Sequence, residues 1–125
     1  VMRLESQLIA IHDLAAGESI GYGARYRCDK PTRVGVVAIG YADGYPRHAP
    51  DGTPVAVNGR STRLIGRVSM DMLTVDLAGQ PNARIGDRVQ LWGDLVDAGA
   101  VARSSDTIAY ELFTRITRRV HLLYR

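Results

Sequence analysis

The chain has 125 residues, of which 46% are hydrophobic and 23% charged, as expected for one folded domain with a single core. Its longest apolar runs are too short to cross a bilayer, and the net charge of +3 is mild. The single cysteine, Cys28, excludes an internal disulfide and a cluster of cysteine ligands, and it favours a reducing, cytoplasmic location. The sequence begins on Val1 without a secretion signal, so we expect residues 1–125 to be one domain of a longer protein.

The first third of the chain predicts strands separated by short turns. Polar and apolar residues alternate over residues 3–14 and again over residues 21–28, which is typical of strands. One face of the first strand would carry Leu4, Ser6, Leu8 and Ala10, and the other Ile9 and Ile11. Residues 33–41 form a continuous, valine-rich apolar run, which indicates a buried strand.

The middle of the chain predicts a long loop, a hairpin and two further strands. Residues 42–54 are rich in aspartate, glycine and proline and indicate the loop. Asn58-Gly59 is the strongest hairpin signal in the sequence, because both residue types accept the positive φ of a tight turn. The further strands are expected within residues 67–77 and residues 88–93.

The pattern changes from strand to helix near the C-terminus. Residues 97–105 are short and alanine-rich and predict one or two helical turns, whereas residues 105–116 have apolar side chains at helical spacing. Residues 118–125 return to a strand. The sequence therefore predicts a mainly β fold, a small barrel or sandwich of about seven or eight strands, with a short helical insert near the C-terminus.

A tyrosine, Tyr22, lies between two glycines in the stretch SIGYGARYRC. Glycines on both sides of an aromatic residue increase the entropy lost on folding and remove packing surface. One explanation is a bulge or edge where the backbone approaches another group closely. The other is that the phenol must remain accessible to a substrate.

Two further stretches carry candidate binding residues. AIGYADGYPR ends the buried strand in a polar, glycine-rich loop, so Tyr41 either lines a site or covers the edge of the core. GRVSMDM alternates Met70 and Met72 with Asp71. The two methionines either line a pocket or belong to the core, with an exposed acid between them.

The remaining polar candidates are weaker. Tyr110, in TIAYELFTR, lies on the predicted second helical segment, where its phenol either donates to a phosphate or carboxylate or faces solvent. His12, His48 and His121 are not at the spacing of metal ligands, so we expect no metal site. No Ser-His-Asp set, P-loop or CxxC motif is present.

Taken in order, these stretches resemble the C-terminal β-domain of alanine racemase. The matching pieces are GESIGYGARY, RVGVVAIGYADGYPR, TPVAVNGR, LIGRVSMDM, GDRVQLWG and TIAYELFTRITRRV. The resemblance implies an isomerase that uses pyridoxal 5'-phosphate, supplies D-alanine for peptidoglycan in the bacterial cell wall and works as a homodimer. In that family an N-terminal (β/α)8 barrel carries the cofactor lysine, and the β-domain completes the active site of the partner subunit.

The same resemblance implies roles for five residues. Tyr22 is the catalytic base for L-alanine and the barrel lysine is the base for D-alanine, because inversion requires bases on opposite faces of the α-carbon. The backbone N–H of Met70 contacts the substrate carboxylate. Tyr41 and Asp71 line the narrow entrance to the active site. Tyr110 contacts the cofactor phosphate or the region of the substrate methyl group.

This chain is expected to lack the cofactor lysine. Its only lysine, Lys30, precedes Pro31 in a predicted turn and is a poor candidate for covalent attachment of a cofactor. Tyr45 and Arg47 are expected to support loop structure. We therefore expect the isolated chain neither to bind pyridoxal phosphate specifically nor to racemise alanine.

Two other functions compete with this interpretation. A broader-specificity amino-acid racemase would be favoured by changes that enlarge the entrance at Tyr41 or Asp71, and the sequence has none. A freestanding basic β-barrel that binds nucleic acid agrees with the pI of 9.4. However, aromatic residues make up only 6% of the chain and the arginines are interspersed with acids, so we expect no salt-sensitive nucleic-acid binding.

Overall fold

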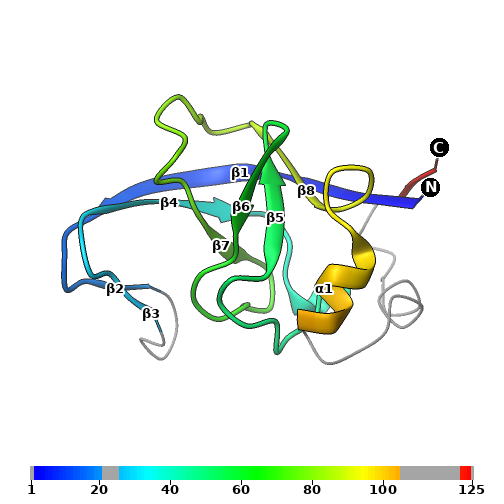
Figure 1. Cartoon of the computed structure of the whole chain (residues 1–125), viewed down its shortest axis with the longest axis horizontal. Helices are drawn as coiled ribbons and strands as arrows, with labels where there is room; N and C mark the ends of the chain where they lie inside the picture. The colour runs from blue at the N-terminus through cyan, green and yellow to red at the C-terminus, as the bar shows by residue number, and fades with distance from the viewer. Residues whose placement is uncertain (1, 21–25, 105–121, 125) are drawn as a thin grey trace.

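The computed structural model describes residues 2–20, 26–104 and 122–124, and these residues form mainly β structure. One long strand, β1 (Met2–Leu14), crosses the molecule, and the other strands of the main sheet are arranged on either side of it (Figure 1). The mainly β fold class predicted from the sequence is confirmed.

The main sheet is antiparallel, with the strand order β6-β5-β8-β1-β4-β7 and with β9 paired to the start of β1. After β1, the elements in chain order are β2 (Ser19–Ile20), β3 (Tyr26–Arg27), β4 (Thr32–Val37), the 3-10 turn η2 (Tyr41–Asp43), β5 (Pro54–Val57), β6 (Arg60–Arg63), β7 (Leu73–Asp76), β8 (Arg88–Trp92), α1 (Ala98–Ser104) and β9 (Leu122–Tyr124). Strands β2 and β3 form a separate two-stranded ladder.

The sheet curls until its two edge strands approach one another. Leu64, directly after β6, forms a single β-bridge with Val75 of β7. The Ile65 N–H donates to the carbonyl of Thr74 at 3.0 Å, which extends this contact. The curvature encloses the core, whose largest fully buried side chains include Trp92, Tyr45, Leu4, Leu8, Leu64 and Leu91. The observed architecture therefore agrees with a small, incompletely closed barrel.

The hairpin between β5 and β6 forms where the sequence predicts it. Asn58 has a φ of 52° and Gly59 a φ of 78°, so both turn residues have the left-handed conformation of a tight two-residue turn. The Asn58 Nδ2 group also donates to the carboxylate of Asp87 at 2.7 Å, which ties the hairpin to the loop before β8.

A strand forms where the first one is predicted, but a bulge interrupts its alternation after Leu8. Leu4 and Leu8 are buried, but the register of β1 against β4 shifts between Leu8 and Ala10, and Ile9 is 44% exposed. The shift coincides with the point where β1 changes its pairing from β8 to β4. A bulge at this point lets one strand belong to two differently oriented parts of a curled sheet.

The predicted strand over residues 67–77 is much shorter in the structure. Only β7 is extended, and the preceding residues form an irregular turn in which the Ser69 N–H donates to the Met72 carbonyl at 2.8 Å. Met70 is 54% exposed and Met72 is 45% exposed. The alternative in which these methionines lie in the core is therefore wrong.

The helical insert is confirmed in part. Helix α1 matches the predicted helical turns within residues 97–105, whereas the second predicted segment, residues 105–116, lies outside the described residues. The described part contains nine strands rather than about seven or eight, and two of them, β2 and β3, have only two residues each. Within that part, no helix is both long enough and apolar enough to span a membrane.

Candidate functional site

Two turns that are distant in sequence meet beyond the end of β4. The Tyr41 N–H donates to the Ser69 carbonyl at 3.0 Å, and the Ala42 N–H donates to the Met70 carbonyl at 2.9 Å. These two hydrogen bonds connect η2 to the turn that precedes β7. The structure thus brings together two of the candidate residues, Tyr41 and Met70.

Gly40 is the point of closest approach between these two turns. A Cβ atom at Gly40 would lie 2.5 Å from the Met70 carbonyl oxygen and closer still to that of Ser69. The φ of Gly40 is −150°, a value open to any residue, so the close contact is what requires glycine here. The carboxylate of Asp43 accepts a hydrogen bond from the Gly40 N–H at 3.0 Å and closes the turn.

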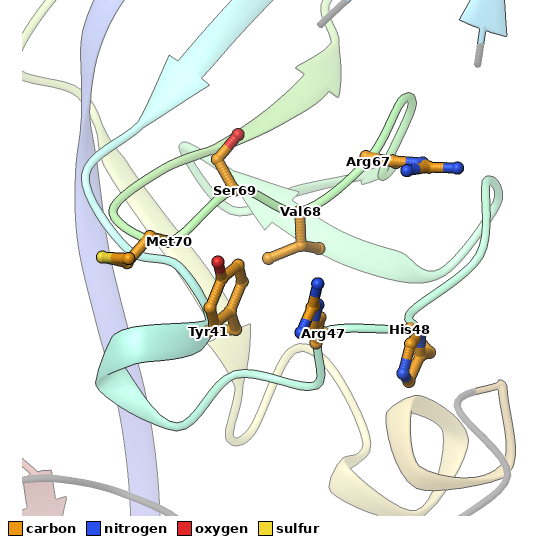
Figure 2. A pocket seen from close by; sticks show the side chains of 7 residues that line it. All are labelled: Tyr41, Arg47, His48, Arg67, Val68, Ser69 and Met70. Carbon is orange, nitrogen blue, oxygen red and sulfur yellow. The ribbon is translucent and has the colours of Figure 1, made fainter. Parts of the chain in front are cut away.

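An open cavity of about 490 Å³ lies beside the joined turns. Its lining is formed by Tyr41, Arg47, His48, Arg67, Val68, Ser69 and Met70. Figure 2 shows Tyr41 and Arg47 on one loop, with Met70 and Ser69 on the facing segment. The loop after β4 and the turn before β7 therefore supply the two walls of the cavity.

Arg47 is in direct contact with the ring of Tyr41. The guanidinium carbon of Arg47 lies 5.0 Å from the centroid of the Tyr41 ring, within the range of a cation–π interaction (Figure 2). We predicted only a loop-supporting role for Arg47, and this interpretation was incomplete because the side chain also lines the cavity. The sequence places Arg47 six residues after Tyr41 but does not reveal that the loop folds back over the ring.

The cavity is lined by basic rather than acidic side chains. Arg47, His48 and Arg67 are all exposed and all line it, and none of its lining residues is an acid. His48, which the sequence did not single out as a binding residue, is thus part of this rim. A concave surface of one charge sign attracts groups of the opposite sign, and guanidinium groups suit carboxylate and phosphate. The arrangement therefore favours an anionic ligand.

A second cavity of about 250 Å³ adjoins the first, because Arg67 and Ser69 line both. Its walls include exposed parts of β1, β4 and β7, together with Met72 and with Ser19 of β2. Ser19 is three positions before Tyr22 in the sequence. Tyr22 itself, like Tyr110, lies outside the described residues.

Asp71 is exposed beside Met70 but is not part of the lining of either cavity.

Tyr45, four residues after Tyr41, is only 1% exposed, and its ring stacks on Trp92 with the centroids 6.2 Å apart. Burial raises the pKa of Tyr45 far above that of a free phenol, so this tyrosine is unsuited to act as a base. Its role is in the core beneath the loop.

Lys30 is exposed and lines neither cavity. No group of three potential metal ligands occurs among the described residues. The described site thus offers cations and backbone groups for an anion, with no lysine to hold a cofactor covalently.

Comparison with known proteins identifies close relatives of this chain. A family model described as "Alanine racemase, C-terminal domain" matches residues 1–124. The alanine racemase of Pseudomonas savastanoi pv. phaseolicola is 59% identical over 124 residues, which are 99% of this chain and 34% of that protein. The catabolic alanine racemase of Pseudomonas aeruginosa is 57% identical over 118 residues, covering 94% of this chain and 33% of that protein.

Solved structures show the same fold. The biosynthetic alanine racemase of Pseudomonas aeruginosa is 54% identical, with a TM-score of 0.93 over 94% of this chain and 33% of that chain. The alanine racemase of Bartonella henselae, solved with covalently bound pyridoxal phosphate, is 30% identical, with a TM-score of 0.88 over 94% of this chain and 33% of that chain. The chain thus spans about a third of the length of the relatives it matches.

Proposed function

Because this chain belongs to the family of alanine racemase C-terminal domains, we propose that it is the C-terminal domain of an enzyme that interconverts L-alanine and D-alanine. The observation that carries the proposal is the basic cavity where Tyr41 and Met70 meet. Both come from the motif pair that resembles the family, and two long-range backbone hydrogen bonds, from Tyr41 to Ser69 and from Ala42 to Met70, join the turns that carry them. The remainder of the protein, a barrel domain, would provide the cofactor lysine, and a second subunit would complete the site.

The described residues fit a ligand with a carboxylate or a phosphate. Arg47 and Arg67 give the cavity a positive rim, and the Met70 backbone N–H would contact the substrate carboxylate. Tyr41 would narrow the entrance, with Asp71 at its outer edge. A small aperture between Tyr41 and Met70 would admit alanine and exclude larger amino acids.

The cofactor of this reaction would be pyridoxal 5'-phosphate, which when bound withdraws electrons and acidifies the C–H bond at the substrate α-carbon. Exposed Lys30 is not placed to hold it, so the attachment lysine would belong to the barrel. Tyr110 would contact the cofactor phosphate or the region of the substrate methyl group. The chain would thus form one wall of the cofactor site rather than the whole site.

Tyr22 would exchange a proton with the α-carbon on the face of L-alanine. A free tyrosine has a pKa of about 10, so only about one molecule in a thousand is ionised near neutral pH. Nearby cations favour the ionised phenolate and lower this barrier. In this proposal the arginine-rich rim would supply such charge, and bases on both faces of the α-carbon would account for inversion of configuration.

The test of this function compares the complete protein with the isolated chain. Both are incubated with L-alanine and pyridoxal phosphate, and D-alanine is measured by chiral chromatography. We expect the complete protein to reach an equal mixture of the two enantiomers and the isolated 125 residues to form no D-alanine. Failure of the complete protein to racemise alanine, or racemisation by the isolated chain, would contradict the proposal. In the cell, D-alanine made in the cytoplasm would supply peptidoglycan.

A further inference from the structure

Asp43 is a buried acid close to the cavity, although it is not one of the lining residues. It is 5% exposed, and its carboxylate accepts the N–H of Gly40 at 3.0 Å while its own N–H donates to the Gly40 carbonyl at 3.0 Å. Removing an ionised carboxylate from water is unfavourable unless hydrogen bonds compensate for the lost hydration. The turn that Asp43 closes is therefore held by a strong, charge-assisted bond.

The turn closed by Asp43 carries the cavity wall. The next two N–H groups along the chain, those of Tyr41 and Ala42, donate to the carbonyls of Ser69 and Met70. A shift of this turn would therefore move the Tyr41 ring and the Met70 backbone relative to one another. The absence of a side chain on Gly40 allows the two turns to approach this closely.

The side chain of Arg47 restrains the ring of Tyr41, independently of the hydrogen bonds that hold the Tyr41 backbone. Arg47 stacks on the ring, with its guanidinium carbon 5.0 Å from the centroid. Asp43 fixes the backbone from which Tyr41 projects, and Arg47 restrains the ring. Together they leave Tyr41 little freedom to swing away from Met70.

We propose that Asp43 is a positioning residue that sets the width of the substrate entrance by fixing Tyr41 against Met70, and that it thereby determines selectivity for a small amino acid. This inference rests on the proposed function, because it assigns alanine to the cavity. It gives Asp43 no contact with the substrate. Its effect is transmitted through the Gly40 N–H and the two backbone bonds of η2.

Three variants of the complete protein test this role. Asp43→Ala removes the acceptor, and Asp43→Asn keeps an oxygen that accepts the same bond. Asp87→Ala is the matched control, because the Asp87 carboxylate also accepts an N–H three residues earlier, that of Arg84 at 2.7 Å, and lies outside both cavities. The measurements are KM and kcat for L-alanine, and the ratio of kcat/KM for L-alanine to that for L-serine.

We expect Asp43→Ala to raise KM for alanine about tenfold, the loss expected from one charge-assisted hydrogen bond, with a much smaller change in kcat. The preference for alanine over serine should fall severalfold, and Asp43→Asn should restore most of both properties. Asp87→Ala should lower thermal stability without changing KM or the preference. The inference is overturned if Asp43→Ala affects these parameters no more than Asp87→Ala does, or if Asp43→Asn is as impaired as Asp43→Ala.

Amide hydrogen exchange separates this inference from the proposed function. In Asp43→Ala, the Tyr41 and Ala42 amides should exchange at least about tenfold faster than in the unmodified protein, and in Asp87→Ala they should not. Unchanged exchange in Asp43→Ala would overturn the role of Asp43 even in an active racemase. A complete protein that did not racemise alanine would overturn the proposed function, while exchange would still report on the turn.

Discussion

Tyr41 and Tyr45 lie four residues apart on one loop, yet their phenols have opposite surroundings. Tyr41 is half-buried at the cavity with Arg47 over its ring, whereas Tyr45 is buried against Trp92. The Tyr45 hydroxyl has no hydrogen-bond partner among the described residues, and burial raises its pKa. Of the two, only Tyr41 is accessible to a ligand. Tyr41 therefore lines the cavity, whereas Tyr45 packs in the core.

The buried hydroxyl of Tyr45 predicts a specific response to alkaline pH. The folded state retains the phenol proton more tightly than the unfolded state, so the stability contribution of neutral Tyr45 is complete below about pH 10 and is lost as the pH rises above it. We expect Tyr45→Phe to reduce the loss of stability above pH 10 and to change the free energy of unfolding at pH 7 by less than about 1 kcal/mol. Urea unfolding of the 125-residue chain at pH 7 and above pH 10, followed by Trp92 fluorescence, measures the free energy of unfolding under both conditions.

Tyr45→Ala is the control for the packing of the ring. Truncation of a buried aromatic side chain should lower the free energy of unfolding by about 3–5 kcal/mol at either pH. A Phe variant that lost as much stability as the Ala variant at pH 7 would contradict this account, because the hydroxyl rather than the ring would then be the stabilising group.

At the residue scale, the sequence indicated Tyr41 and Met70 as candidate binding residues, but it did not indicate that Arg47 lines the same cavity. The first two belong to short motifs whose composition marks a binding loop. The contact between Arg47 and Tyr41 depends on how the loop folds back, which is decided by hydrogen bonds to Ser69 and Met70 from a distant part of the chain. Sequence spacing alone does not contain that information.

The same distinction applies to whole elements. The β5–β6 hairpin was predictable because the positive φ of Asn58 and Gly59 is a local property of those two residues. The shortening of the predicted strand over residues 67–77 to β7 was not predictable, because the turn at 67–72 is stabilised by hydrogen bonds to η2. The bulge in β1 likewise reflects a change of partner strand, which alternation within one strand does not encode.

The joined turns predict the outcome of a substitution at Gly40. Gly40→Ala would place a methyl group against two backbone carbonyls that cannot rotate away, so we expect the free energy of unfolding to fall by about 1–3 kcal/mol. Gly79→Ala is the matched control, because nothing lies within 4 Å of a Cβ there and its φ is not positive. Urea unfolding of both variants measures the difference. Equal stability of the two variants would contradict the close approach.

At the scale of the whole molecule, the positive charge of the described residues is distributed rather than gathered into a stripe. Among these residues, arginines lie within ion-pair distance of acids in the pairs Arg3–Asp94, Arg33–Asp13, Arg63–Asp76, Arg88–Glu5 and Arg103–Asp97. The basic rim of the cavity is a local exception. This distribution fits a small anionic ligand better than a nucleic-acid backbone, which requires an extended row of cations.

The curled sheet brings segments that are distant in sequence to one side of the described chain. The cavity beside η2 and the cavity bordered by Ser19 of β2 share Arg67 and Ser69, so the two cavities are neighbours. Under the proposed function, a barrel domain placed against this side would complete the site.

The proposed role of Tyr22 as the base for L-alanine is tested most directly by measuring α-deuterium loss from each enantiomer in the complete protein carrying Tyr22→Phe. We predict that loss from L-alanine falls by about 10²–10⁴-fold, the usual contribution of a general base, while loss from D-alanine continues through the lysine proposed for the barrel. Tyr45→Phe, which alters a buried phenol in the core, should affect neither. Equal loss from both enantiomers in Tyr22→Phe, or no change in either, would contradict the assignment.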